Sequence, residues 1–227
     1  MKRAAAGEVK FNSGNALEVF VVIFLNGVSS SGKSSIARAL QDLWRTPLLH
    51  VGVDSFIDMM PTRFCGDGPD AHLGLEFAPT HTEQGSVVEI RQGPYAKKLF
   101  AGMVGAIGAL ARAGSDLVVD EVLFGDGMLK EYVRELSGQS VYFIAVNCPL
   151  EIVERRERER GDRFVNSARA QFPLVHGPTR RYDLELDTSR TTPDQLARRI
   201  YEYVASVAHP QGFLAMRSDF AAAQPES

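Results

Sequence analysis

The segment that most constrains this chain is a short glycine- and serine-rich stretch, residues 27–34, which reads GVSSSGKS. It follows a continuously apolar run, residues 19–25, whose many β-branched side chains predict a strand buried on both faces. A helix is expected to begin near Lys33, because apolar side chains then share one face at Ile36, Ala37, Leu40 and Leu43. In this context of strand, tight turn and helix, the pattern G-x-x-x-x-G-K-S/T is typical of a phosphate-binding loop.

The chemistry expected of this loop follows from its backbone. Gly27 and Gly32 permit conformations that a side chain would block, so that successive N–H groups can surround a phosphate at the positive end of the helix. Lys33 is expected to reach the β- and γ-phosphates of ATP, and the Ser34 hydroxyl to bind Mg²⁺. The alternative is a turn that merely caps the helix. The residues predicted to contact the nucleotide are Gly27, Val28, Ser29, Ser30, Ser31, Gly32, Lys33, Ser34 and Ser35.

Strands and helices alternate along the rest of the chain. Further strands are expected at residues 48–53, 116–120, 141–147 and 182–186, and longer helices at 95–112, 127–136, 150–160 and 193–207. This order predicts an α/β fold, with three α/β/α layers around a mostly parallel five-stranded sheet, and the loop at residues 27–34 makes it a P-loop fold. A single domain is expected over residues 19–208. The irregular stretch 62–98 would shape a substrate pocket, and within it residues 86–92 could form a short strand or hairpin arm. Residues 1–18 and 209–227 would be flexible extensions.

Composition excludes several classes of protein. The chain has 227 residues and a net charge of -3, which argues against a nucleic-acid-binding protein. Its longest apolar run, residues 19–25, is too short to span a membrane. The two cysteines, Cys65 and Cys148, have neither metal-ligand spacing nor a neighbouring histidine cluster. Cys148 is expected to be a buried thiol, and a reducing, cytoplasmic location is predicted.

Two aspartates at predicted strand ends are candidate site residues. Ligands of open α/β sheets bind beyond the carboxyl ends of the strands, which is where Asp54 and Asp120 are expected. Asp54 would accept the proton of an attacking hydroxyl or orient it; alternatively, it caps a short helix over residues 56–60. Asp120 would hold the hydrated Mg²⁺, the alternative being a solvated strand end. Glu121 follows and should point in the opposite direction if the strand continues.

An arginine-rich stretch, residues 155–163, is a candidate lid over the triphosphate. Gly161 interrupts the predicted helix, and guanidinium groups on either side suit phosphate oxygens and charge on a transferring group. Arg160 and Arg163 are assigned to this catalytic role, and Arg156 to contact with the nucleotide. The alternative is an exposed helix whose Glu–Arg pairs contribute roughly a few tenths of a kcal/mol each, as we expect for Arg155 and Arg158.

Several separate blocks together resemble the chloramphenicol phosphotransferases: residues 24–34, 51–56, 118–122, 160–163 and 182–188. The resemblance covers most of the region from Val21 to about Ser189. It implies the fold of small-molecule and nucleotide kinases and transfer of the γ-phosphoryl group of ATP to the primary hydroxyl of chloramphenicol. It also implies that Asp54 is the base. Residues 62–98 depart from the family pattern in being longer and richer in glycine, proline and charge.

Three hypotheses on function remain open. The first is an antibiotic-modifying O-phosphotransferase with a small-molecule hydroxyl acceptor, and apolar residues near Asp54 could line its acceptor pocket or belong to the core: Phe56, Met59, Met60, Phe64 and Phe77. The second is a metabolic kinase for a sugar acid, a shikimate-like polyol or a nucleoside, for which Arg63 or Arg91 could hold an anion. The third is a nucleotide-binding regulatory module, against which Asp54 and the lid arginines argue. The sequence is compatible with a homo-oligomer without indicating one.

Overall fold

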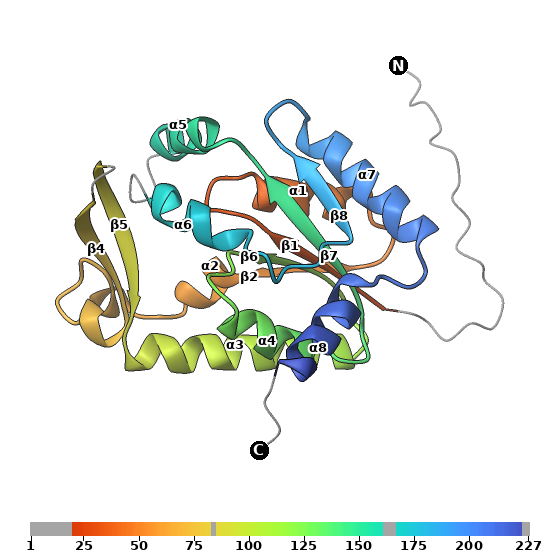
Figure 1. Cartoon of the computed structure of the whole chain (residues 1–227), viewed down its shortest axis with the longest axis horizontal. Coiled ribbons are helices and arrows are strands. Elements are labelled where there is room, and N and C mark those ends of the chain that lie inside the picture. The colour runs from red at the N-terminus through yellow and green to blue at the C-terminus, as the bar shows by residue number, and fades with distance from the viewer. Residues whose placement is uncertain (1–19, 83–84, 161–166, 224–227) are drawn as a thin grey trace.

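The computed structural model describes residues 20–82, 85–160 and 167–223 of the chain. At its centre lies a five-stranded sheet in the order β2-β6-β1-β7-β8, in which every neighbouring pair is parallel (Figure 1). Its strands are β1 (Val21–Asn26), β2 (Leu48–Gly52), β6 (Asp116–Glu121), β7 (Ser140–Asn147) and β8 (Leu184–Asp187). The predicted α/β architecture with a mostly parallel five-stranded sheet is confirmed.

Helices cover both faces of this sheet, which explains why its central strands are apolar throughout. Alternate residues of β1 point to opposite faces, Ile23 and Leu25 to one and Val22 and Phe24 to the other. The first face packs against α1 (Lys33–Leu43) and α7 (Pro193–Ser206). The second packs against α3 (Pro94–Arg112), α4 (Gly127–Glu135) and α8 (Gly212–Ala222) (Figure 1). The loop after β1 therefore follows a strand that is packed on both faces.

A smaller sheet lies beside the main one, within the stretch expected to be irregular. It contains β3 (Cys65–Gly66), β4 (Leu75–Thr82) and β5 (Gly85–Gln92), with β4 and β5 antiparallel. Only the second arm was predicted, as residues 86–92. The first arm was not predicted because Pro79 is untypical of a strand. Pro79 lies, however, where β4 pairs with β5 alone, and edge strands tolerate proline. Short 3-10 helices precede the hairpin, at Thr62–Phe64 and Ala71–Leu73.

The chain turns into a helix earlier than predicted after β2. This strand ends at Gly52, and α2 (Val53–Ile57) follows directly, whereas the sequence suggested a strand to residue 53 and a helix over 56–60. Asp54 therefore lies in the first turn of α2, where an acidic side chain is favoured by the helix dipole. Gly52 occupies the N-cap position without a side-chain capping bond, so the capping alternative for Asp54 is not what the structure contains.

Two helices near the end of the chain were not predicted. The arginine-rich helix α5 (Leu150–Arg160) was expected, but α6 (Ser167–Val175) was not, and its Pro173 and polar residues hide it. Residues 209–227 were expected to be a flexible tail, yet α8 forms there. Phe213 and Met216 anchor α8 in the core, and the Asp183 carboxylate accepts hydrogen bonds from the N–H groups of Gln211 and Gly212. Two apolar anchors in an alanine-rich segment are too weak a periodic pattern to predict from sequence.

The sequence also led to expectations about Cys148 and about membrane-spanning segments. Cys148 is buried, as predicted. In the described part of the chain, no helix combines the length and the apolar character that crossing a membrane requires.

Candidate active site

The loop between β1 and α1 has the backbone that its glycines predict. Gly32 has a φ of 105°, in the left-handed region that favours glycine. Gly27 lies so close to β7 that a Cβ atom there would be 2.5 Å from the Val146 carbonyl oxygen. Both glycines are therefore required by the local geometry. The loop ends at the first turn of α1, where unpaired N–H groups and the helix dipole favour an anion.

Lys33 lies over this loop and is almost fully buried. Its Nζ donates hydrogen bonds of 2.9 Å to the carbonyl oxygens of Gly27 and Val28 and is 3.6 Å from Asp120 Oδ1. The ammonium group is thus held at the mouth of the loop by neutral carbonyl groups and one carboxylate. Phosphate oxygens entering the loop would be stronger partners for it than the carbonyl groups.

Ser34 and Asp120 meet as the sequence predicts. The Ser34 hydroxyl donates a hydrogen bond of 2.6 Å to Asp120 Oδ2, and His50 Nε2 lies 3.5 Å from the same oxygen. Burial by itself raises the pKa of Asp120, but the charge of Lys33 and the hydrogen bonds from His50 and Ser34 lower this pKa to about 2. The carboxylate is therefore ionised at neutral pH. His50 on β2 was not selected from the sequence, which offered no signal for it beyond its strand.

A cavity of about 670 Å³ opens in front of the loop. Of the residues predicted to bind nucleotide, those that line it are Ser29, Ser30, Gly32, Lys33, Ser34, Ser35 and Arg156. Val28 and Ser31 are buried behind the loop, and Gly27 packs against β7. Asp54, Asp120 and Arg160 also line this cavity. Arg163 lies outside the described residues.

Arg156 joins three parts of this cavity wall. Its guanidinium group donates hydrogen bonds to the Ser31 carbonyl oxygen, at 3.3 Å, and to the side-chain and backbone oxygens of Thr188, at 3.1 and 2.7 Å. Helix α5 is thereby tied to the loop and to the end of β8. Three charged residues of α5 line this side of the cavity, Arg156, Glu159 and Arg160.

A second cavity of about 250 Å³ adjoins the first and is lined mainly by apolar side chains. Asp54, Ser29, Val53 and Val122 line both cavities, so Asp54 lies where the two meet. The apolar wall includes Leu75, Phe77, Ile90, Phe100, Phe124 and Met128. These residues come from the hairpin, from α3 and α4, and from the segment after β6.

Most of the apolar residues that the sequence suggested for the acceptor pocket do not line the second cavity. Phe77 lines the second cavity, whereas Phe56 and Met60 belong to the core, Met59 is exposed and Phe64 packs edge-on against Tyr95. Proximity to Asp54 in sequence was a poor guide, because the hairpin and α3 bring distant segments to the cavity.

Glu121 is the buried acid of this second cavity. It is fully buried on β6 and points away from its neighbour Asp120, as strand alternation predicts. Its Oε1 accepts a hydrogen bond of 2.8 Å from the Tyr132 hydroxyl, whereas Oε2 has no hydrogen-bond partner among the described residues. Burial raises the pKa of Glu121 to about 8, although the Tyr132 hydrogen bond acts in the opposite direction.

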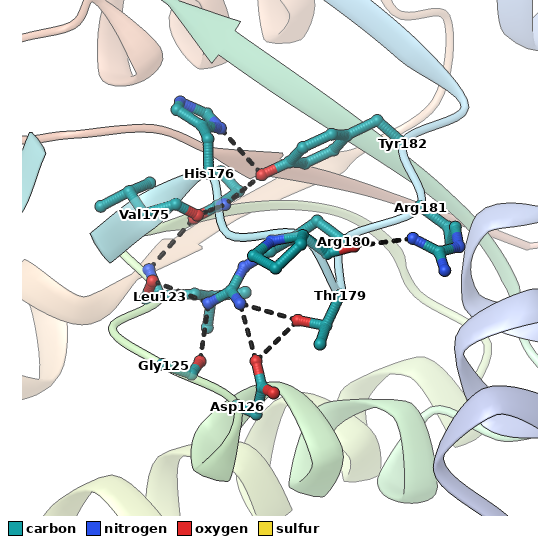
Figure 2. Close-up of polar contacts among 11 residues, drawn as sticks. Leu123, Gly125, Asp126, Val175, His176, Thr179, Arg180, Arg181 and Tyr182 are labelled. Carbon is teal, nitrogen blue, oxygen red and sulfur yellow. Dashed lines mark hydrogen bonds and ion pairs between the residues drawn. The ribbon is translucent and has the colours of Figure 1, made fainter. Parts of the chain in front are cut away.

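Two walls of the second cavity are joined by a cluster of polar contacts (Figure 2). The buried Arg180 guanidinium donates to Asp126 Oδ1 and to the Gly125 carbonyl oxygen, each at 2.7 Å. The Asn26 side chain extends the cluster, because it bonds to the backbone of both Leu123 and Val175. We call this cluster the Arg180 anchor. It links the segment after β6 to the end of α6, and both elements contribute residues to the cavity.

Comparison with known proteins assigns a family to this arrangement. The model of the chloramphenicol phosphotransferase-like proteins matches residues 21–205. The chain belongs to this family. A Mycobacterium tuberculosis protein named "Putative O-phosphotransferase", recorded in two strains, is 30% identical over 207 residues, which cover 88% of each chain. The resemblance inferred from the sequence is thus confirmed.

Solved structures agree with the fold of this family member. A sugar kinase from Janibacter sp. HTCC2649 superposes with a TM-score of 0.54 at 19% identity, over 82% of this chain and 94% of that one. The Mycobacterium tuberculosis APS kinase, solved with AMPPNP and APS, gives a TM-score of 0.54 at 16% identity, over 83% and 99%. At these identities the likeness establishes the P-loop kinase fold alone.

Proposed function

We propose that this chain is an ATP-dependent O-phosphotransferase that phosphorylates a hydroxyl group of an uncharged small molecule, with chloramphenicol as the first candidate. The observation that carries this proposal is the position of Asp54, where the loop cavity meets the apolar cavity. A carboxylate at such a junction can reach both the acceptor hydroxyl and the terminal phosphate. Family membership supports the same reaction class.

The proposed reaction uses the residues of both cavities. Asp54 takes the proton of the acceptor hydroxyl as its oxygen attacks the γ-phosphorus. The bond from this phosphorus to the β–γ bridging oxygen breaks, and ADP leaves. Lys33 leaves the carbonyl groups of the loop for the β- and γ-phosphates, and Arg160 stabilises the charge that develops on the transferred group. Arg163 is proposed to act with Arg160, and Arg156 to hold the nucleotide side of the cavity.

Magnesium fits the oxygen atoms beside the loop. Ser34 and the ionised Asp120 present two hard ligands close together. The described residues contain no group of three or more His, Cys, Asp or Glu that could hold a metal by themselves. This suits Mg²⁺, which keeps several waters and shares few protein ligands with substrate phosphates. When bound, the ion would neutralise charge on the β- and γ-phosphates.

The positions of the two candidate arginines favour an uncharged acceptor over an anionic one. Arg63 bonds to Asp70, and Arg91 lies between Glu76 and Glu89. Neither arginine lines the apolar cavity. A sugar acid or another anion would thus find no arginine of the described residues there. A regulatory nucleotide-binding module would have no use for an apolar cavity that shares Asp54 with the loop.

Mass spectrometry tests the proposal directly. The protein is incubated with ATP, Mg²⁺ and chloramphenicol, and the drug is examined for the mass gain of one phosphoryl group. Lys33→Ala serves as the inactive control and Lys97→Ala, an exposed lysine on α3, as the matched active control. Product from the wild type and Lys97→Ala alone supports the proposal. If no alcohol in a panel of uncharged acceptors gains phosphate while ATP still binds, the proposed reaction is wrong.

A further inference from the structure

Ser30, in the middle of the phosphate-binding loop, has a backbone conformation that serine rarely adopts. Its φ is 60°, and among the described residues it is the one residue other than glycine with a positive φ. It lies in a turn that the Ser31 N–H closes on the Val28 carbonyl oxygen, at 3.2 Å, and glycine or asparagine is the usual residue where such a turn needs a positive φ. A strained conformation of this kind persists only where the surrounding structure holds it.

Gln171 on α6 supplies part of that support. Its Oε1 accepts a hydrogen bond of 2.9 Å from the N–H of Ser29, the residue directly before Ser30. The Gln171 side chain is almost fully buried, so that little water competes for this bond. On the other side of Ser30, the Thr188 hydroxyl donates a hydrogen bond of 2.7 Å to the Ser31 carbonyl oxygen. Both neighbours of Ser30 are thus held by side chains from outside the loop.

Helix α6 is itself fixed at its start, so that it can hold the loop. The buried Glu157 on α5 accepts hydrogen bonds from the Ser167 hydroxyl, at 2.6 Å, and from the Ala168 N–H, at 3.1 Å. Both donors lie in the first turn of α6, where N–H groups have no partner within the helix. The position of Gln171 therefore depends on α5 and α6 together and not on the loop.

Binding of a nucleotide makes support from outside the loop more important. In the proposed reaction Lys33 leaves its two carbonyl partners in the loop for the phosphates, whereas the bond from Gln171 is not exchanged. Resting on the proposed function for the identity of the ligand, we infer that Gln171 is a positioning residue for phosphoryl transfer. Through Ser29 it holds Ser30 in the left-handed conformation, and so keeps the loop in the shape that binds the triphosphate of ATP.

This role has a measurable consequence for affinity. A ligand that binds one conformation alone loses affinity in proportion to the fraction of molecules that leave that conformation. Gln171→Met keeps the length of the side chain but removes the acceptor of the Ser29 N–H. We expect it to raise the dissociation constant of a non-hydrolysable ATP analogue with Mg²⁺ about tenfold. Gln171→Asn, whose amide is one methylene too short to reach Ser29, should have the same effect.

The dissociation constants are measured by calorimetry on the full chain. Acceptor is left out, because Gln171 also lines the apolar cavity and a substitution there could change acceptor binding directly. The matched control is Gln139→Met, at a half-buried glutamine that lines neither cavity, and it should keep the wild-type affinity. Thermal unfolding verifies that each variant is folded.

Ser30→Gly separates this role from simple packing of α6. The Ser30 hydroxyl has no hydrogen-bond partner among the described residues, so glycine removes no bond of that side chain while it removes the steric cost of the positive φ. In the Gln171→Met background, we expect Ser30→Gly to improve affinity at least about fivefold more than it does in the wild-type background, where the loop is already held. A glycine in the loop could not repair a displaced α6.

Two results would overturn the inference. The first is an unchanged dissociation constant in both Gln171→Met and Gln171→Asn. The second is an equal effect of Ser30→Gly in the two backgrounds, which would mean that Gln171 acts independently of the strained residue.

Phosphoryl transfer to the panel of uncharged alcohols is measured separately, so that the two ideas can fail independently. If the analogue binds with the expected pattern but no alcohol is phosphorylated, the proposed function is wrong and the role of Gln171 stands. If an alcohol is phosphorylated but Ser30→Gly has equal effects in the two backgrounds, the proposed function stands and the role of Gln171 is wrong.

Discussion

The loop cavity and the apolar cavity meet at Asp54 but are built in different ways. The first depends on one continuous segment, residues 27–35, whose backbone shape is set by two glycines and a helix start. The second takes its side chains from the hairpin, α3, α4, α6 and the segment after β6. A site formed by backbone atoms depends on consecutive residues, whereas a site formed by side chains depends on which distant segments the fold brings together. The two cavities should therefore respond differently to substitution.

The largest effect is expected in the loop cavity. Lys33→Ala removes the positive charge that we assign to the β- and γ-phosphates, and should lower kcat/KM by at least about 10³-fold. Transfer is measured as phosphorylated acceptor at saturating and limiting ATP. Lys97→Ala, which changes the net charge equally, should stay near the wild-type value. Activity of Lys33→Ala within tenfold of wild type would contradict the phosphate contact.

Substitution of Asp54, which lies where the two cavities meet, should affect phosphoryl transfer but not the binding of ATP. Asp54→Asn keeps the size of the side chain but removes the proposed base, so kcat should fall by about 10²- to 10⁴-fold. The dissociation constant of ATP, measured by calorimetry, should change less than about threefold because the loop is untouched. The exposed Asp42→Asn on α1 is the matched control. Transfer at the wild-type rate would eliminate Asp54 as the base.

The apolar cavity should affect the acceptor alone. Phe124→Ala removes an aromatic wall, and should raise the KM of the acceptor about tenfold through lost apolar contact while leaving the KM of ATP unchanged. Phe172→Ala, at an exposed phenylalanine on α6 that does not line the cavity, should change neither constant. An equal rise in both KM values for Phe124→Ala would mean that the cavities are not separate in function.

The smallest effect is expected in the Arg180 anchor. Asp126→Asn leaves the buried guanidinium with a neutral partner, and should lower the free energy of unfolding by about 1 kcal/mol, roughly fivefold in the unfolding constant. Chemical denaturation measures this change. Asp219→Asn breaks an ion pair in which both side chains are 49% exposed, and should cost less than about 0.5 kcal/mol. Equal losses would show that burial of Arg180 adds nothing to its ion pair.

The same difference between the two cavities explains which features could be predicted from the sequence. The buried β1, the loop, α1 and the meeting of Ser34 with Asp120 depend on strong local patterns and on the rule that ligands bind at strand ends. The strand alternation also indicated that Asp120 and Glu121 point apart. The cavity around Glu121 could not be predicted, because Phe100 and Phe124 reach it only after α3 and the segment after β6 have packed. Helices α6 and α8 were not predicted for a related reason, because tertiary contacts stabilise them more than the periodicity of their apolar residues does.

The Arg180 anchor has a consequence for how this protein can change over generations. It joins the elements that form the cavity walls through Asn26, Asp126 and Arg180, none of which lines the cavity. Side chains facing the acceptor can thus be exchanged while the join between their elements is retained. Selection for a new acceptor can act on the lining residues with little loss of stability, so that one scaffold can give rise to a series of specificities.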